Sequence, residues 1–247
     1  MRKVLDVDRL AVRHRPDGQP VMHQDWGKLL FIHWRVDPNL FRPIIPSKLQ
    51  VDTYDGSAWL GVVPFTMWDI RGFPPYMPPI PGLNAMHELN VRTYVHYDGV
   101  PGVWFFSLDC TSQAAVLAAR RFYYLPYYKS HIDLEQNEQA ITYECQRLEA
   151  PAAGFSTRWE IGRNLPRSEP ESLEFFLTER YCLYSEQRGQ IYRSRVFHQP
   201  WKLQTANIDF LESSMVESLG LITPDDEPLL HYGEEISVEI WKLTKCE

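Results

Sequence analysis

Residues 86–109 read MHELNVRTYVHYDGVPGVWFFSLD, two runs of alternating side chains joined by Asp98-Gly99. Alternation with a period of two is typical of a β-strand, because successive side chains point to opposite faces. Asp-Gly is a frequent dipeptide in the tight turn of a β-hairpin. The stretch therefore predicts a hairpin of two antiparallel strands, over residues 86–97 and 103–109.

The two faces of this hairpin differ in polarity. An even-length loop groups apolar side chains on one face: Leu89, Val91, Val95, Trp104, Phe106 and Leu108. The other face then carries Glu88, Asn90, Arg92, Tyr94, His96, Phe105, Ser107 and Asp109. An odd-length loop, which Pro101-Gly102 permits, would change this pairing.

Two explanations fit the polar face. It meets solvent while the apolar face meets the core, or it lines the interior of a curved sheet. In a confined interior Glu88 and Arg92 would perturb each other's ionisation, as catalytic and ligand-holding groups do. Periodicity does not decide between the two, although Phe105 on this face is more typical of an interior.

Strands predominate along the rest of the chain. They are predicted over residues 28–36, two within 49–67 around Asp55-Gly56, 127–131, 138–147, 155–161, 180–185, 190–198 and 235–243. Short helices are predicted at Asp37-Pro38, over 113–122 behind Thr111 or Ser112 as N-cap, over 170–178 and over 208–218. Strand–helix–strand units are not apparent, so we expect a mainly β (α+β) fold. One domain over residues 21–247 would follow a charged, weakly ordered lead-in over residues 1–20.

Composition narrows the classes of partner. The chain has 247 residues, 44% of them hydrophobic, and a formal net charge of −7 without a Lys/Arg cluster, which disfavours a nucleic-acid partner. It has no long apolar run and no signal-peptide pattern, so we expect no membrane partner and a cytoplasmic location. Four scattered cysteines indicate free thiols in a reducing compartment. A homo-oligomer is expected only because such assemblies are common.

A proline-rich segment, RGFPPYMPPIPG, occupies residues 71–82. Its prolines cannot donate to a β-ladder, so the segment predicts an extended loop. Such a loop would serve as a peptide ligand for an aromatic-groove domain or as a stiff loop over a pocket mouth, and we favour the second role.

Three motifs carry a resemblance to a known family: ELNVRTYV at 88–95, GVWFFSL at 102–108, and Arg120-Arg121 followed by LPYY at 125–128. They resemble the uncharacterised YqjF-type family of the acetoacetate-decarboxylase-like superfamily. The likeness extends over most of the chain. It implies a cone-like or barrel-like antiparallel sheet with a few short flanking helices and an internal cavity, and it places Glu88 where the superfamily has a pocket glutamate.

The resemblance also bears on chemistry. Decarboxylases of this superfamily carry a Pro-Lys-Lys element whose first lysine forms an imine with the substrate. Here Pro126 aligns with the proline, while Tyr127 and Tyr128 align with the lysines, and a phenol cannot form an imine. Lys129 would face the same way as Tyr127, about 6.6 Å further along a strand. It is either a substitute for the missing lysine or a solvated surface residue.

These considerations name the candidate site residues. The candidate catalytic residues are Glu88, Tyr127 and Arg121. The candidate ligand-binding residues are Asn90, Arg92, Phe105, Ser107, Tyr128 and Lys129. Tyr127 and Arg121 each have an alternative, purely structural role. Tyr127 would pack in the core, and Arg121 would interact favourably with the dipole at the C-terminus of a helix. No metal or cofactor is predicted, because the histidines lack ligand spacing and the nucleotide-binding glycine motifs are missing.

The sequence is compatible with three functions. The first is an enzyme acting on a small carbonyl or carboxylate compound, without the imine-forming lysine of the superfamily. The second is a non-catalytic protein that binds such a molecule in the same internal pocket. The third is a structural or interaction protein that uses the proline-rich loop as its contact surface.

Overall fold

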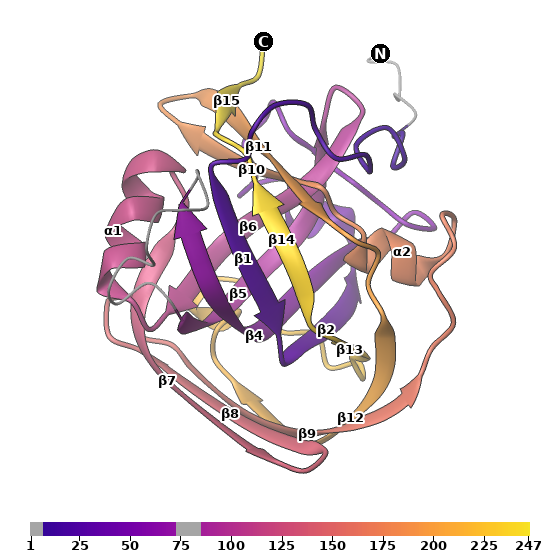
Figure 1. Ribbon diagram of the computed structural model, residues 1–247, viewed down its shortest axis with the longest axis vertical. Coiled ribbons are helices and arrows are strands. Elements are labelled where there is room, and N and C mark those ends of the chain that lie inside the picture. The colour runs from indigo at the N-terminus through magenta and orange to yellow at the C-terminus, as the bar shows by residue number, and fades with distance from the viewer. Residues whose placement is uncertain (1–6, 73–84) are drawn as a thin grey trace.

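The computed structural model describes residues 7–72 and 85–247, which form mainly β-strands (Figure 1). The strands are β1 (Met22–Gly27), β2 (Leu29–Val36), β3 (Gln50–Val51), β4 (Ala58–Gly72), β5 (Ala85–Tyr97), β6 (Val100–Cys110), β7 (Tyr127–Asn137), β8 (Ala140–Arg147), β9 (Gly154–Asn164), β10 (Cys182–Gln187), β11 (Gln190–His198), β12 (Leu203–Ser213), β13 (Leu229–Gly233), β14 (Ile236–Ile240) and β15 (Thr244–Lys245). The helices are α1 (Gln113–Phe122) and α2 (Leu173–Thr178), with 3-10 turns at Pro38–Leu40 and Glu217–Leu219. No helix in the described residues is long and apolar enough to cross a membrane.

The strands form one sheet that closes on itself twice. Its order is β1-β14-β11-β10-β6-β7-β8-β9-β12-β13-β2-β4-β5-β3, and the pairings β1–β4 and β6–β5 close it. Closure produces a smaller barrel of β4, β1, β14, β11, β10, β6 and β5. It also produces a larger barrel that runs from β6 through β7, β8, β9, β12, β13, β2 and β4 back to β5. Strands β4, β5 and β6 belong to both barrels, which confirms the barrel-like β fold.

Two pairings depart from the antiparallel pattern. β6 pairs in parallel with β7 and with β10. Helix α1 explains the first case, because it carries the chain back along the sheet before β7 begins, and parallel neighbours need such a crossover. In Figure 1, β7, β8, β9 and β12 then form the curved wall along the lower side of the molecule.

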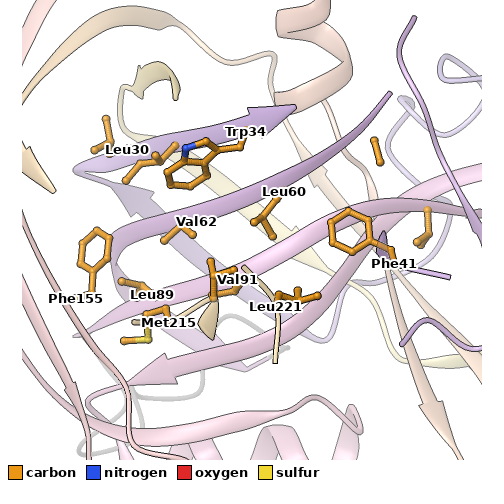
Figure 2. Packing of buried hydrophobic residues seen from close by; sticks show 14 of the residues in the cluster. Leu30, Trp34, Phe41, Leu60, Val62, Leu89, Val91, Phe155, Met215 and Leu221 are labelled. Carbon is orange, nitrogen blue, oxygen red and sulfur yellow. The ribbon is translucent and has the colours of Figure 1, made fainter. Parts of the chain in front are cut away.

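The hydrophobic core fills the larger barrel. Figure 2 shows side chains from β2, β4 and β5 pointing into one space: Leu30, Trp34, Leu60, Val62, Leu89 and Val91. Phe155 of β9 meets them there, and all seven of these side chains are buried. Each such side chain contributes about 1.5–3 kcal/mol when it leaves water.

The central hairpin has the predicted turn but a different register. Tyr97 pairs with Val100 around Asp98 and Gly99, whose φ angles of 48° and 78° are those of a tight hairpin turn. Further along, however, Val91 pairs with Ser107 and Arg92 with Phe105, so that Phe106 is an extra residue in β6. This β-bulge reverses the alternation of β6 beyond the turn.

The bulge corrects the sequence-based assignment of faces. Ser107 and Asp109 pair with Val91 and Leu89, so they face the larger barrel and not the polar face with Glu88. Leu108, predicted on the apolar face, pairs with Asn90 and lies on the side of the smaller barrel. A single inserted residue exchanges the two faces because the side-chain period of a strand is two.

Most of the other predicted elements are present. Helix α1 covers the predicted residues, and the Ser112 hydroxyl caps it by accepting from the Ala115 amide. Helix α2 begins at Leu173, three residues later than predicted, behind Ser172 as N-cap. The cysteines Cys110, Cys145, Cys182 and Cys246 are all free and buried.

The helix predicted over residues 208–218 is wrong. Residues 203–213 form β12, which pairs with β9 so that Ile208 lies opposite Trp159. A bulge between Ile208 and Phe210 breaks the alternation, so the residues lack the period of two that would have identified a strand. Of the proline-rich segment, Arg71 and Gly72 end β4, and the remainder lies outside the described residues.

A buried ion pair joins three strands of the larger barrel. Arg147 on β8 donates from Nε and Nη2 to the two carboxylate oxygens of Asp109 on β6, both at 2.7 Å. The Ser130 hydroxyl on β7 donates to the same carboxylate at 2.7 Å, and the Tyr128 ring lies 4.1 Å from the guanidinium carbon. Both charged side chains are fully buried, so each supplies the counterion that the other needs away from water.

We expect Arg147→Met to lower the free energy of unfolding by about 3–5 kcal/mol, because it leaves the Asp109 carboxylate buried without its counterion. Urea unfolding measures the change. Arg158→Met on neighbouring β9 is the control, since its pair with Asp209 is about 40% exposed and worth less than ~1 kcal/mol. Equal losses in the two variants would contradict the assigned role of the buried pair.

Candidate functional site

A cavity of about 250 Å³ lies within the smaller barrel. Every strand of that barrel contributes to its lining, with Trp26, Phe65, Asn90, Leu108, Leu183, Val196 and Ile240 as one example from each. Helix α1 covers the cavity with Ala115, Ala118 and Ala119, whose small side chains allow close packing against the sheet. The volume is below the roughly 300–1,000 Å³ of pockets for drug-sized ligands, so it suits a small molecule.

Polar groups enter this apolar cavity from one side of β5. Glu88, Asn90 and Arg92 occupy alternate positions on the strand and all line the cavity. Glu88 and Asn90 are each only 3% exposed. The polar face of the hairpin therefore faces an interior and not solvent, because β5 is a wall shared by two closed barrels.

Glu88 and Tyr127 form the shortest polar contact in the cavity. The Tyr127 hydroxyl, at the start of β7, donates to Glu88 Oε2 at 2.6 Å. Burial raises the pKa of Glu88 to about 7, although hydrogen bonds from Tyr127 and Asn90 act in the opposite direction. Burial and the neighbouring Glu88 charge raise the pKa of Tyr127 well above 10. At neutral pH the phenol thus keeps its proton and donates a hydrogen bond, whereas the carboxyl group gains and loses its proton in this pH range.

Arg92 brings a positive charge into the same cavity. Its guanidinium carbon lies 5.3 Å from the centre of the Phe31 ring and 5.7 Å from that of Tyr94. Its Nε is buried without a hydrogen-bond partner, and it forms no ion pair with any described residue. Aromatic faces attract the cation but do not neutralise it, so Arg92 is available to an anion.

Tyr94 fixes the position of this arginine. Its hydroxyl donates to the Leu177 carbonyl at 2.6 Å, so it accepts from Arg92 Nη2 at 3.4 Å and from His33 Nε2 at 2.6 Å. This donor–acceptor network assigns the Nε2–H tautomer to His33 and leaves its buried Nδ1 unprotonated and without a partner. Burial, and next the charge of Arg92, lower the pKa of His33 well below 6.5, so the imidazole stays neutral.

Asn90 completes the polar set. Its side chain hydrogen-bonds to Glu88, while its Oδ1 is buried and has no partner in the described part of the chain. An unpaired buried carbonyl oxygen costs about 1–3 kcal/mol, which a ligand with a hydroxyl or amide N–H would recover. The cavity thus presents one cation, one open acceptor and one group that titrates near neutral pH.

The structure does not bring all predicted site residues together. Glu88, Asn90, Arg92, Phe105 and Tyr127 line the cavity. Ser107 faces the larger barrel because of the bulge in β6. Arg121, Tyr128 and Lys129 are absent from the lining as well.

Local geometry explains why Arg121, Tyr128 and Lys129 lie outside the lining. Arg121 is exposed on α1 with its guanidinium 5.6 Å from the Phe122 ring, because the alanine side of the helix faces the cavity. Tyr128 alternates with Tyr127 along β7 and stacks on Arg147. Lys129 donates to the Thr111 carbonyl oxygen, outside the cavity lining.

Sequence reasoning missed several lining residues. Gln24 and Trp26 come from β1, where the Trp26 indole N–H donates to Gln24 Oε1 at 2.7 Å. Their segment, MHQDWG, has too few β-branched residues to indicate a strand. Tyr123 follows α1, and burial raises its pKa to about 12. The aromatic run Phe122-Tyr123-Tyr124 was the one available signal for this side of the cavity.

One group of described residues has the composition of a metal site. His23, Asp25 and Asp69 place their ligand atoms within 4.8 Å of one another, outside the lining of the cavity. Asp69 pairs with Arg71, and Asp25 accepts a hydrogen bond from the Ser237 hydroxyl at 2.6 Å. These contacts already account for the carboxylates, so the group is a surface ion-pair network.

Comparison with known families agrees with this architecture. A model of uncharacterised conserved proteins, DUF2071, matches residues 23–237. The chain belongs to the DUF2071 family. The uncharacterised protein YqjF of Bacillus subtilis (strain 168) is 40% identical over 230 residues, covering 93% of this chain and 94% of that protein.

Several solved structures share the fold at low sequence identity. The enduracididine biosynthesis enzyme MppR, complexed with pyruvate, has a TM-score of 0.66 at 11% identity, covering 92% of this chain and 91% of its own. An acetoacetate decarboxylase-like enzyme from Sphingomonas wittichii RW1 has a TM-score of 0.64 at 14% identity, covering 93% and 94%. Acetoacetate decarboxylase from Legionella pneumophila has a TM-score of 0.62 at 11% identity, covering 93% and 88%. These likenesses establish the acetoacetate decarboxylase-like fold of the family.

We expect the stability gained by Glu88→Gln to depend on pH. The Glu88 pKa rises from 4.5 in the unfolded chain to about 7, so the folded state binds the proton more tightly. The wild type therefore loses stability as pH rises from 4.5 to 7, by at most about 3 kcal/mol. Urea unfolding at pH 4 to 8 should show that the free energy of unfolding of Glu88→Gln increases relative to that of the wild type as pH rises from 4.5 to 7.

Glu135→Gln is the control for that comparison, since Glu135 is exposed on β7. Its stability relative to the wild type should stay constant over the same range. A flat difference for Glu88→Gln as well would mean that Glu88 is not desolvated in the folded protein.

Proposed function

We propose that this protein binds a small, largely apolar carboxylate in the smaller barrel and transfers a proton to or from it through Glu88. Arg92 would hold the carboxylate, and Asn90 Oδ1 would accept a hydrogen bond from a hydroxyl or N–H group of the ligand. The apolar lining would contact the rest of the molecule. Carbonyl compounds that carry a carboxylate fit this pattern best.

The unpaired Arg92 guanidinium carries the proposal. The Arg92 side chain is half-buried, so it loses part of its hydration in the mostly apolar cavity, and proteins normally compensate such a cation with a counterion. The Asp109–Arg147 pair does so in the larger barrel, yet Arg92 has no such partner among the described residues. A ligand carboxylate would supply the missing charge and would displace water from the aromatic rings beside it.

Glu88 and Tyr127 support the second half of the proposal. A general acid or base works best when its pKa is close to the operating pH, and the Glu88 pKa of about 7 meets this condition. The ionised carboxylate would remove a proton from carbon next to a carbonyl group, and the protonated form would return it. Tyr127 would donate a hydrogen bond to the carboxylate in its ionised state.

We expect the affinity for small carboxylates to depend on Arg92 and to fall above pH 7. NMR titration would compare pyruvate and acetoacetate with their neutral amides. Arg92→Met should weaken carboxylate binding about tenfold or more, and Arg92→Lys less. Ionised Glu88 repels a second carboxylate, so affinity should fall by up to about tenfold per pH unit above 7.

Arg121→Met is the matched control, because Arg121 lies on the exposed side of α1. It should bind each carboxylate as the wild type does. Equal binding of carboxylates and amides, or a loss in Arg121→Met but not in Arg92→Met, would contradict the proposed carboxylate site.

A second candidate is binding without any reaction. It is favoured by the absence of lysine from the described residues that line the cavity, because no amine is then in place to form an imine. The interaction role of the proline-rich loop rests on residues 73–84, which lie outside the described part of the chain.

Hydrogen–deuterium exchange separates the two candidates. In D2O we expect the protein to speed the exchange of the pyruvate methyl protons, since Glu88 would remove a proton from that carbon and return a deuteron. Glu88→Gln should retain pyruvate binding and lose this activity, as followed by proton NMR. Saturable binding with no accelerated exchange in the wild type would assign the chain to the binding-only class.

A further inference from the structure

A second hollow, which shares no lining residue with the barrel cavity, is strongly basic. It has a volume of about 320 Å³ and is formed where residues 13–15 meet the segment before α2 and the end of β11. Its basic lining residues are Arg13, His14, Arg15, Arg167 and His198. No aspartate or glutamate occurs among its described lining residues, although the chain as a whole has a net charge of −7. We call this hollow the basic cleft.

The segment that carries Arg13 is fixed in place. Val12 is buried, and Arg195 on β11 donates from Nη2 to the carbonyl oxygens of Val12 and His14 at 2.7 and 3.1 Å. Arg15 forms a two-point ion pair with Glu239 on β14, at 2.5 and 2.9 Å. The backbone is thus held on both sides of Arg13, so the cleft is a built feature of the fold.

Charge in the cleft is only partly compensated. Glu239 neutralises Arg15, and burial lowers the pKa of His198, which stacks on Tyr181, so this imidazole is neutral at pH 7. Arg13 and Arg167 form no ion pair with any described residue. Arg13 hydrogen-bonds to the Tyr181 hydroxyl and lies 5.8 Å from the Phe175 ring.

The Glu179 carboxylate, which hydrogen-bonds to Tyr181 of the cleft lining, does not neutralise these two arginines. Glu179 accepts hydrogen bonds from the Trp201 amide at 2.9 Å and from the Tyr181 hydroxyl, so both of its oxygens already have donors. It is buried and does not line the cleft. The lining therefore combines two guanidinium groups that have no ion-pair partner among the described residues with the side chains of Tyr181, Phe197 and Pro200.

We propose that the basic cleft binds a phosphate group, with Arg13 and Arg167 as the residues that contact it. Guanidinium groups are the preferred partners of phosphate, because their N–H groups match its oxygens in pairs. Arg13 and Arg167, which are far apart in sequence, together carry two positive charges and so balance the charge of a phosphate dianion. The ligand is either inorganic phosphate or a phosphate monoester whose organic part would contact Tyr181, Phe197 and Pro200.

NMR titration of the full-length protein tests this site. Inorganic phosphate should give saturable shifts that chloride at the same ionic strength does not give. Arg167→Met should raise the dissociation constant about tenfold, and Arg13→Met combined with it should raise the constant further. Because Arg167 is exposed, its loss leaves the fold intact.

Arg163→Met is the control, since Arg163 is an exposed arginine at the end of β9 that does not line the cleft. It should bind phosphate as the wild type does. Tighter binding of glycerol phosphate than of inorganic phosphate would identify a monoester as the ligand, and equal or weaker binding would identify the inorganic ion. The proposal is overturned if phosphate shifts match those of chloride, or if Arg163→Met and Arg167→Met weaken binding equally.

Discussion

The arrangement of this protein depends on β5, which is hydrogen-bonded to β4 on one side and to β6 on the other as a wall of two closed barrels. In an ordinary antiparallel sheet one face of such a strand meets solvent. Here both faces are interior. Leu89 and Val91 face the packed core of the larger barrel, while Glu88, Asn90 and Arg92 face the cavity of the smaller one. A polar pattern that would be ordinary on a surface becomes chemically significant because it is buried.

In the part of the chain that the structure describes, the buried charges of the larger barrel are paired, whereas Arg92 in the smaller barrel is not. In the larger barrel Asp109 and Arg147 satisfy each other with two hydrogen bonds, and Ser130 adds a third. That cluster is complete and stabilises the junction of β6, β7 and β8. In the smaller barrel Arg92 contacts the Phe31 ring and Tyr94 but has no counterion among the described residues, which also provide no donor for Asn90 Oδ1. Buried polar groups whose hydrogen bonds and charges are all paired indicate a structural role. Polar groups that lack partners within a cavity indicate a place for a ligand.

Local patterns predicted much of the fold. The Asp98-Gly99 turn and helix α1 depend on neighbouring residues alone, and both are present as predicted. Of the two N-cap candidates, Thr111 and Ser112, the structure has Ser112. Sequence reasoning also identified five of the residues that line the cavity, because alternation along β5 groups Glu88, Asn90 and Arg92 on one face. It was wrong where alternation breaks. The bulge at Phe106 places Ser107 on the opposite face, and the irregular β12 lacks the period of two that distinguishes a strand from a helix.

The sequence by itself determined most of the strands, the Asp98-Gly99 turn and the grouping of Glu88, Asn90 and Arg92 on one face of β5, because these follow from steric preferences and a period of two. Only the tertiary structure decided what that face meets. Closure of the sheet through β1–β4 and β5–β6 joins residues far apart in the chain, and it removes Glu88 from water so that its pKa rises to about 7. The basic cleft likewise exists only after folding, since Arg13 and Arg167 come from segments more than a hundred residues apart. Desolvation and the convergence of distant charges depend on long-range packing, which no local pattern records.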